Sequence, residues 1–326
     1  MNLFPTSVHW RAPRTIVAII VLAAFVLLPF AVGSEGDFYV KFATRVLIYA
    51  LAAIGLNFIL GFGGMVSLGH AMYIMLGAYC VGIPMHHEIT SGWAHLAFAI
   101  ALTAVLATVV GAVALRTTGI AFIMITLAFA QMLFFVAVSL KEYGGDDGLT
   151  IAARSNFGLF DIASNVSLYY LAFSAVLLAL YLSWRAVLSP FGLILRGSKA
   201  NSRRALALGH PILRYQLVAY VLSALVCAVA GVLLANLTQF ASPSYGAWTL
   251  SGELIVIVIL GGLGTVFGPL VGAVCLLVLE EILPTLVEAT FPDYKSNWML
   301  LLGLFIFFVA LLLKRGVFGS LRGGAK

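Results

Sequence analysis

Apolar runs of the length that a lipid bilayer requires recur along most of this chain. A helix that crosses a bilayer needs roughly 20 mainly apolar residues, and within lipid only helices and closed barrels satisfy their own backbone polar groups. The runs lie at about 16–32, 43–60, 71–84, 96–115, 119–139, 168–188, 215–235, 251–262, 265–283 and 298–313. The sequence therefore predicts an all-α, polytopic integral membrane protein with about ten membrane segments, some of them short or broken.

The composition excludes a water-soluble fold. Of the 326 residues, 63% are hydrophobic and 9% are charged, whereas soluble domains are about half apolar and a quarter charged. Membrane segments with short connections leave no room for a sizeable soluble domain, so we expect one transmembrane domain over residues 1–326. The three cysteines lie inside apolar runs without paired spacing, which favours small packing residues over a disulfide framework or a zinc site: Cys80, Cys227 and Cys275.

The first apolar run has two interpretations. It follows Arg11 and Arg14, and Gly33 and Ser34 offer small residues near a possible cleavage point, as in a signal peptide. The alternative is an uncleaved first span, which a polytopic protein already needs, and this is the interpretation we adopt.

The basic residues predict the orientation. If the N-terminus is cytoplasmic and all segments cross, most of the 18 Lys and Arg residues fall in inner loops, and the outer side keeps Lys41, Arg45, Lys141, Arg154 and Lys295. Inner loops are enriched in Lys and Arg, so this pattern favours both termini inside. It also explains the net charge of +6 without a nucleic-acid partner.

The longest inner loop, 189–214, carries basic residues and no acid. Pro190, Gly192 and Gly209 bracket a compact stretch, and 201–208 could form a short helix that ends at Gly209. One interpretation is a positively charged anchor that sets the topology. The other is a docking element for a cytoplasmic partner.

Two glycine-rich segments interrupt the apolar runs, at 56–79 and 252–273. At a constant offset of 200 they share five residues, Gly61/Gly261 and Gly64/Gly264 among them, which suggests an internal repeat. Irregular backbone at membrane depth persists only where protein or a wet cavity satisfies it, and broken segments in two halves of a chain indicate a transport site. Close helix packing through small residues is the alternative.

Polar residues in or beside these segments complete the predicted path. Glu253 enters an apolar run at its outer end, and His70 is expected to make a structural hydrogen bond. Thr126 and Gln131 could line the path or bond a neighbouring helix. The candidate path residues are Gly61, Gly63, Gly64, Ser67, Gly69, His70, Thr126, Gln131, Glu253, Gly261, Gly262, Gly264 and Thr265.

No phosphate-binding loop of the form G-x-x-x-x-G-K-[ST] occurs in the sequence. If nucleotide hydrolysis drives transport, ATP and Mg²⁺ therefore belong to other subunits, and we expect no cofactor on this chain. His86, His87 and Glu88 lie together on a short outer loop but lack a second ligand set, so we expect no metal site.

Several motifs together resemble a known family, the M-type permease subunits of branched-chain amino acid ABC importers, within a wider group of sugar and urea permeases. The resemblance covers about 43–313. It rests on Leu56-Asn57, Gly61, Gly64, Ser67-Leu68-Gly69-His70-Ala71, Gly77-Ala78-Tyr79, Gly119-Ile120, Thr126-Leu127-Ala128-Phe129, Gly144-Gly145, Gly148-Leu149, Ser189-Pro190-Phe191-Gly192, Arg196, Ala207-Leu208-Gly209, Gly261-Gly262, Gly264-Thr265 and Gly268-Pro269. The chain is neutral at Ala200, Ser202 and Gln131, near which relatives often carry acidic residues.

The resemblance implies an importer in a bacterial cytoplasmic membrane, with a sister permease, two cytoplasmic ATPases and an extracytoplasmic binding protein as partners. It implies that 189–214 is the coupling loop and that the ATPase acts on Pro190, Gly192, Arg196, Ala205, Leu206 and Gly209. Branched-chain amino acids are the implied solute, with urea or short-chain amides as the alternative.

Two rival functions remain. A secondary transporter or channel that works alone would use Glu253 as an ion-coupled carboxylate. A membrane enzyme would use histidines as acid–base groups, but the spans contain no paired carboxylates and no nucleophile beside a base. We expect a transport protein and not an enzyme.

Overall fold

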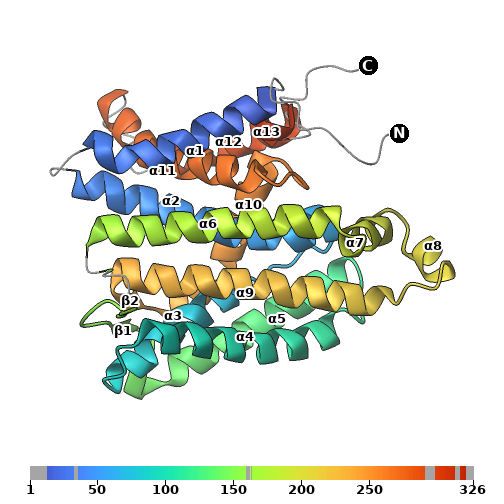
Figure 1. Cartoon of the computed structure of the whole chain (residues 1–326), viewed down its shortest axis with the longest axis horizontal. Coiled ribbons are helices and arrows are strands. Elements are labelled where there is room, and N and C mark those ends of the chain that lie inside the picture. The colour runs from blue at the N-terminus through green and yellow to red at the C-terminus, as the bar shows by residue number, and fades with distance from the viewer. Residues whose placement is uncertain are drawn as a thin grey trace.

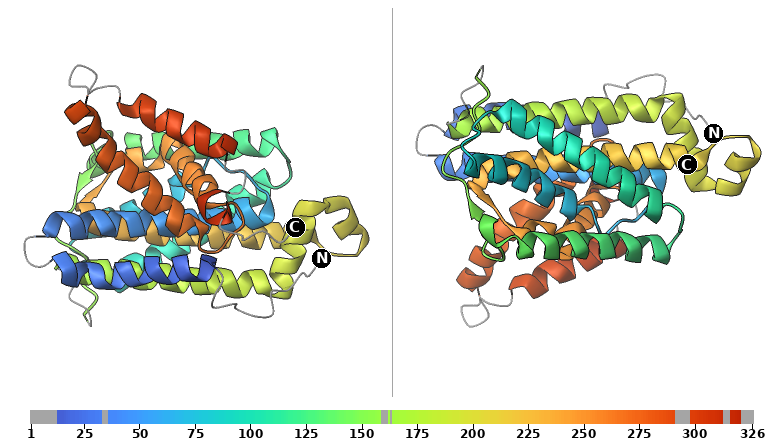
Figure 2. Two further views of the ribbon diagram at one scale, coloured as in Figure 1. Left: turned by 90° about the horizontal axis from the view of Figure 1, so that it is seen from above. Right: turned by 90° about the horizontal axis from the view of Figure 1, so that it is seen from below.

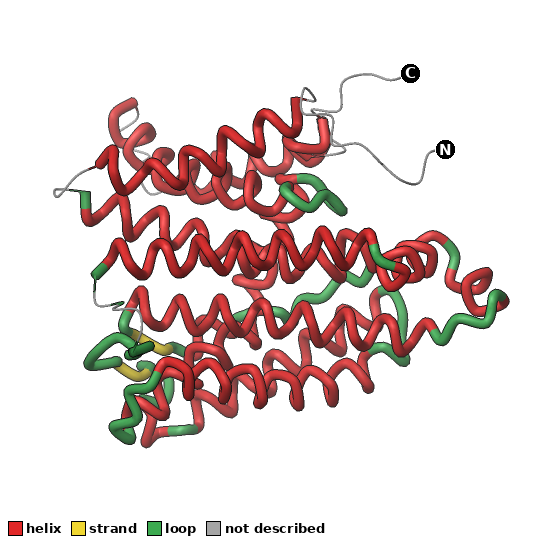
Figure 3. Tube along the Cα trace, in the orientation of Figure 1, coloured by secondary structure: helices red, strands yellow, loops and turns green. Residues whose placement is uncertain are grey.

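Each of the ten apolar runs falls on a helix in the computed structural model, which describes residues 13–32, 36–158, 162, 164–290, 298–312 and 316–320. Gly33, Ser34 and Lys295 lie outside the described residues. The helices, shown in Figures 1 and 3, are α1 (Pro13–Val32), α2 (Asp37–Asn57) with the π-helix η1 (Phe58–Gly63), α3 (Ala71–His86), α4 (Gly92–Ala114), α5 (Ile120–Ser139), α6 (Asn165–Leu188), α9 (Ile212–Thr238), α10 (Trp248–Gly261), α11 (Gly268–Thr290) and α12 (Trp298–Leu312).

Six helical segments of the described chain are long and apolar enough to cross a membrane. They are Asp37–Gly63, Gly92–Ala114, Ile120–Ser139, Asn165–Leu188, Ile212–Thr238 and Gly268–Ala289. The helices α3 and α10 have 16 and 14 residues, which agrees with the expectation that some of the membrane segments are short. The chain is therefore an all-α, multi-pass membrane protein.

Burial divides the helices into a centre and a periphery. In α2 with η1, 94% of the apolar stretch is buried inside the protein, whereas in α5 only 22% of the apolar stretch is buried. The helices α3 and α9 pack against each other and α9 packs against α2, which makes these three the centre of the bundle. The outer helices turn large apolar side chains away from the protein, such as Ile120 and Phe135 on α5, as a lipid-facing surface requires.

The backbones of α3 and α9 approach closely at two reciprocal positions. A Cβ atom on Gly77 would overlap the carbonyl oxygen of Ala228, and a Cβ on Gly231 would overlap the carbonyl oxygen of Ile74. Small residues permit such contact between membrane helices, where tight packing replaces the hydrophobic effect as the main attraction. These two glycines therefore set the distance between two central helices.

The loop 189–214 forms two short helices. The predicted helix at 201–208 is confirmed as α8 (Ser202–Ala207), and Gly209 follows it with a φ of 83°. A second helix, α7 (Pro190–Ala200), begins directly after α6, with Ser189 as its N-cap and proline at its first position. Figure 2 shows α7 and α8 projecting from one end of the bundle.

The all-α prediction missed one small sheet. The strands β1 (Leu149–Thr150) and β2 (Phe240–Ala241) pair antiparallel, with Leu149 opposite Ala241, at the end of the bundle away from α7 (Figure 1). Two-residue strands have no alternating pattern that a sequence could reveal. Three further short elements are η2 (Lys141–Tyr143), η3 (Pro243–Gly246) and α13 (Gly316–Ser320).

Candidate functional site

Both glycine-rich segments are breaks between helices. The first runs from Gly64 to His70, between η1 and α3, and the second runs from Gly262 to Phe267, between α10 and α11. Gly64 and Gly264 have φ values of 73° and 71°, a left-handed conformation that glycine adopts without steric cost. The two positions differ by the offset of 200 found in the sequence, so the same backbone turn occurs at corresponding places.

The second break touches the helix that precedes the first break through Asn57, which is 2% exposed at the junction of α2 and η1. Its side-chain Nδ2 donates to the Thr265 carbonyl at 2.9 Å, and its Oδ1 accepts from the Gly264 N–H at 3.1 Å. A Cβ on Gly61 would lie 2.5 Å from the Gly264 nitrogen. One buried amide thus supplies a donor and an acceptor to irregular backbone that lipid could not satisfy.

His70 lies at the end of the first break in a closed hydrogen-bond network. Its Nδ1 is 2.9 Å from Ser67 Oγ, and its Nε2 is 3.0 Å from Ser223 Oγ. The Ser223 hydroxyl donates to the Gly55 carbonyl at 2.6 Å, so it accepts from Nε2–H, and the Ser67 hydroxyl donates to Nδ1. Every polar atom of the ring is satisfied by one neutral tautomer, which assigns His70 a structural hydrogen-bonding role.

The start of α3 is also tied to α10. The Ala71 N–H donates to Ser251 Oγ at 2.9 Å, and both residues have no exposed surface. The first turn of a helix has N–H groups without helical partners, and a serine from another helix satisfies this one.

Three predicted path residues lie outside these networks. Thr126 donates to the carbonyl of Ile123 in its own helix at 2.9 Å, and a Cβ on Gly69 would overlap its carbonyl oxygen. Gln131 is half-buried on α5. In the described part of the chain, Glu253 Oε1 is buried without a hydrogen-bond partner. Its carboxylate is within electrostatic range of Glu280 and Arg45.

The predicted coupling loop contacts the helix that carries the predicted path residues Gly61 and Gly63, because α7 packs along η1. Phe191 stacks on Phe58 with ring centroids 6.2 Å apart and planes 5° from parallel. Leu195 Cδ1 would lie 3.5 Å from a Cβ on Gly63. These two residues of α7 are four positions apart and so occupy one face of the helix.

The predicted coupling residues of 189–214 have separate structural roles. Arg196 donates to the Val187 carbonyl at 3.0 Å and to the Gly192 carbonyl at 3.2 Å, which fixes the corner between α6 and α7. In α8, Ala205 is 8% exposed, whereas Leu206 is 58% exposed. The segment therefore has a packed inner side and an outward apolar side chain.

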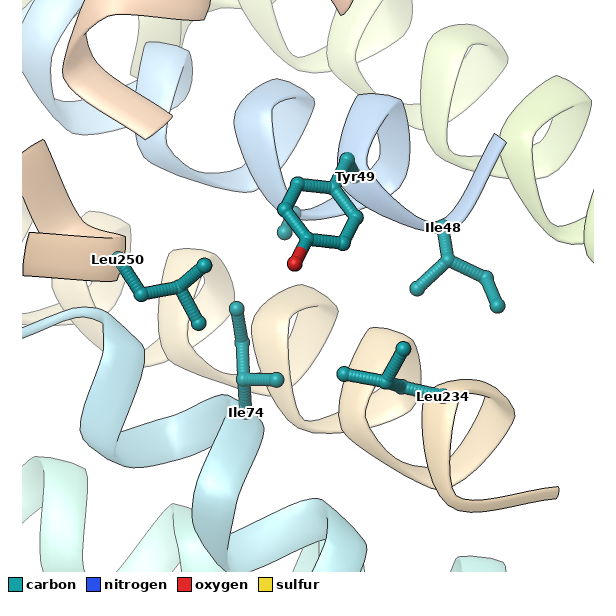
Figure 4. A pocket seen from close by; sticks show the side chains of 6 residues that line it. Ile48, Tyr49, Ile74, Leu234 and Leu250 are labelled. Carbon is teal, nitrogen blue, oxygen red and sulfur yellow. The ribbon is translucent and has the colours of Figure 1, made fainter. Parts of the chain in front are cut away.

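Neither of two hollows in the described protein contains a predicted path residue. The small one, about 10 Å³, is shown in Figure 4 and is lined by Ile48, Tyr49, Ala52, Ile74, Leu234 and Leu250. It is at the lower limit for holding one water molecule. The larger one, about 410 Å³, lies between α2, α4, α6 and α9 with an apolar lining.

No group of three or more His, Cys, Asp or Glu side chains that could hold a metal gathers in the described ranges. What the residues form is a junction in which two broken segments and the segment 189–209 meet.

Sequence reasoning gave no site role to four residues of this junction: Asn57, Lys199, Ser223 and Ser251. The carboxamide of Asn57 inside an apolar run was a usable signal, because a buried polar side chain needs partners. Lys199 carried no such signal, since it lies among other basic residues in a loop. The two serines are ordinary in membrane helices.

Two permease proteins of Escherichia coli are similar to this chain in sequence. A protein of Escherichia coli (strain K12) named "High-affinity branched-chain amino acid transport system permease protein LivM" is 28% identical over 312 residues, which cover 88% of this chain and 70% of that protein. LivH of the same organism, named as a permease protein of the same kind of system, is 26% identical over 278 residues, 79% of this chain and 89% of LivH.

One solved structure, PsaBC from Streptococcus pneumoniae in complex with Fab, matches with a TM-score of 0.45 and 14% identity, over 88% of this chain and 94% of that one.

A protein-family model identifies the family of this chain. It is described as "Branched-chain amino acid transport system / permease component", and it matches residues 38–310. These residues include both breaks, the junction at Asn57 and the whole of 189–214. The chain belongs to this family of transport permease components.

Proposed function

We propose that this chain is a permease subunit of an ATP-binding-cassette importer for branched-chain amino acids, driven by ATP hydrolysis on separate subunits. The observation that carries the proposal is the family match over residues 38–310. The names of LivM and LivH, permease proteins of a high-affinity branched-chain amino acid transport system, support the solute. Urea or a short-chain amide is the alternative solute.

The proposed partners are a sister permease, two cytoplasmic ATPases and an extracytoplasmic binding protein. Two E. coli relatives are both named as permeases of such a system, which supports a permease pair. Neither the small hollow of Figure 4 nor the larger one beside α6 is lined by a predicted path residue, and this supports a path between two subunits over one inside the described chain. ATP and Mg²⁺ belong to the ATPases, and this chain holds no cofactor.

The proposed topology has about ten membrane segments in a bacterial cytoplasmic membrane, with both termini and 189–214 on the cytoplasmic side. The distribution of basic residues supports it. The helices α7, α8 and α13 lie toward one end of the bundle and the β1–β2 sheet lies at the other (Figure 1), an arrangement that agrees with this topology. The coupling loop then faces the ATPases, and the breaks lie on the path from the binding protein.

The rival function is ion-coupled transport by this chain alone, and the unpartnered oxygen of Glu253 is the observation that favours it. Glu253→Gln discriminates between the two. If ATP drives uptake, we expect the variant in the complete complex to take up leucine within about twofold of the unmodified rate, whereas losing a proton-transferring carboxylate costs about 100-fold or more.

The assay is uptake of radiolabelled leucine into proteoliposomes with ATP inside, and each variant is measured with and without an ion gradient. Glu281→Gln, which changes an exposed carboxylate on α11, is the matched control. Abolished uptake for Glu253→Gln alone would favour the ion-coupled rival. Unlabelled valine should compete for uptake, and competition by urea in its place would favour the amide permease.

A further inference from the structure

A set of contacts leads from α7 through η1 to both breaks, and it includes one charged residue, Lys199. Phe191, Leu195 and Lys199 are spaced four residues apart, so they form one stripe along α7. The first two pack on η1 through Phe58 and Gly63. Lys199 Nζ donates to the Gly61 carbonyl oxygen of η1 at 2.7 Å.

The Lys199 contact fits the chemistry of a helix end. Gly61 lies within the last turn of η1, where carbonyl groups lack helical N–H partners. A cation is favoured at this end of a helix by the macrodipole, and a charged donor makes a short, strong hydrogen bond. The Lys199 stem also covers Gly64, since a Cβ on that glycine would lie 2.8 Å from Lys199 Cγ.

The far side of η1 holds the second break. Asn57, which immediately precedes η1, bonds to Gly264 and Thr265, and Gly61 itself touches the Gly264 backbone. The π-helix has wider hydrogen-bond rings than an α-helix and marks functional sites in many proteins. The helix η1 therefore lies between α7 and the second break and contacts both.

We propose that Lys199 is the positioning residue that links the movement of the segment 189–209 to both breaks, by holding the Gly61 carbonyl and covering Gly64. This inference rests on the proposed function and deepens it. In this role Lys199 sets how many solute molecules are moved per ATP hydrolysed, and it does not contact the solute. Adjacency alone does not establish energetic coupling, so the test measures coupling directly.

Lys199→Met keeps the aliphatic stem and removes the donor. In proteoliposomes with the complete complex, we expect leucine moved per ATP hydrolysed to fall about tenfold, the factor that a hydrogen bond to a charged group contributes. Lys199→Arg should recover most of the ratio, because it restores a charged donor. Lys41→Met, at the other end of α2, controls for a lost surface lysine and should leave the ratio unchanged.

Gly64→Asn tests the same contact without changing the charge. Asparagine tolerates the left-handed backbone, and its Cβ displaces the Lys199 stem. We expect the coupling ratio to fall to a similar extent, and the double variant with Lys199→Met to be no worse than the lower single variant, since both remove one contact.

Two results would overturn the inference. One is an unchanged ratio in Lys199→Met; the other is a double variant whose loss equals the product of the two single losses. Failure of the proposed function is distinguishable, because the unmodified complex would then show no ATP-dependent leucine uptake. A variant that fails to assemble is identified by size-exclusion chromatography, and Lys199→Arg then serves as the deciding variant: a ratio unlike that of the unmodified complex contradicts the inference.

Discussion

Gly77→Val is expected to prevent the chain from reaching its folded state in the membrane. The new side chain would collide with the Ala228 carbonyl of α9, and backbone atoms on a central helix cannot move away as a side-chain end can. Overpacking of a tight interior costs about 1–3 kcal/mol, and we expect this backbone clash to exceed that range. Gly231→Val should act alike, because it meets the Ile74 carbonyl of α3.

The measurement is the yield of monodisperse protein in detergent and its melting temperature. Gly303→Val is the matched control, since a Cβ at Gly303 has nothing within 4 Å, and it should behave like the unmodified chain. A normal yield and melting temperature for Gly77→Val would show that α3 and α9 do not cross at this point.

Asn57→Leu is the second large effect. Leucine has a similar volume but leaves the Gly264 N–H and the Thr265 carbonyl without their side-chain partner, and each unsatisfied buried group costs about 1–3 kcal/mol. The helices keep their other contacts, so the chain should still fold. Because the second break loses its bonds to the α2–η1 junction that leads into the first break, we expect leucine uptake by the complete complex to fall more than about tenfold.

A graded series sharpens this prediction. Asn57→Asp keeps an acceptor for the Gly264 N–H but loses the donor to the Thr265 carbonyl, so its uptake should lie between those of the leucine variant and the unmodified chain. Uptake and melting temperature are measured on the same preparations. Full uptake by Asn57→Leu would mean that the contact between the breaks is irrelevant to transport.

The helices could be predicted from the sequence because lipid imposes a length and a polarity on each span. The ten apolar runs all fall on helices, and even the short run before Gly262 was recognisable by its length. The breaks were visible in the sequence as Gly61-Phe62-Gly63-Gly64 and Gly261-Gly262-Leu263-Gly264. The left-handed backbone at Gly64 and Gly264 selects glycine. The stop signal at Gly209, two residues after the end of α8, followed from the same rule.

Pairings across the chain could not be predicted in this way. The bond from Lys199 to Gly61 joins residues 138 positions apart, and the bond from Asn57 to Thr265 joins residues 208 positions apart. No periodicity records which helix a polar group will meet. The close approach at Gly77 was equally hidden, since a glycine in a membrane helix fits a path, a break or a crossing.

The central claim is that this chain is a conduit whose driving force comes from partner subunits. The most direct test is uptake of radiolabelled leucine into proteoliposomes that contain this chain, the sister permease and the binding protein, with and without the two ATPases and internal ATP. We expect accumulation only when the ATPases and ATP are both present. Equal accumulation without the ATPases would contradict the claim.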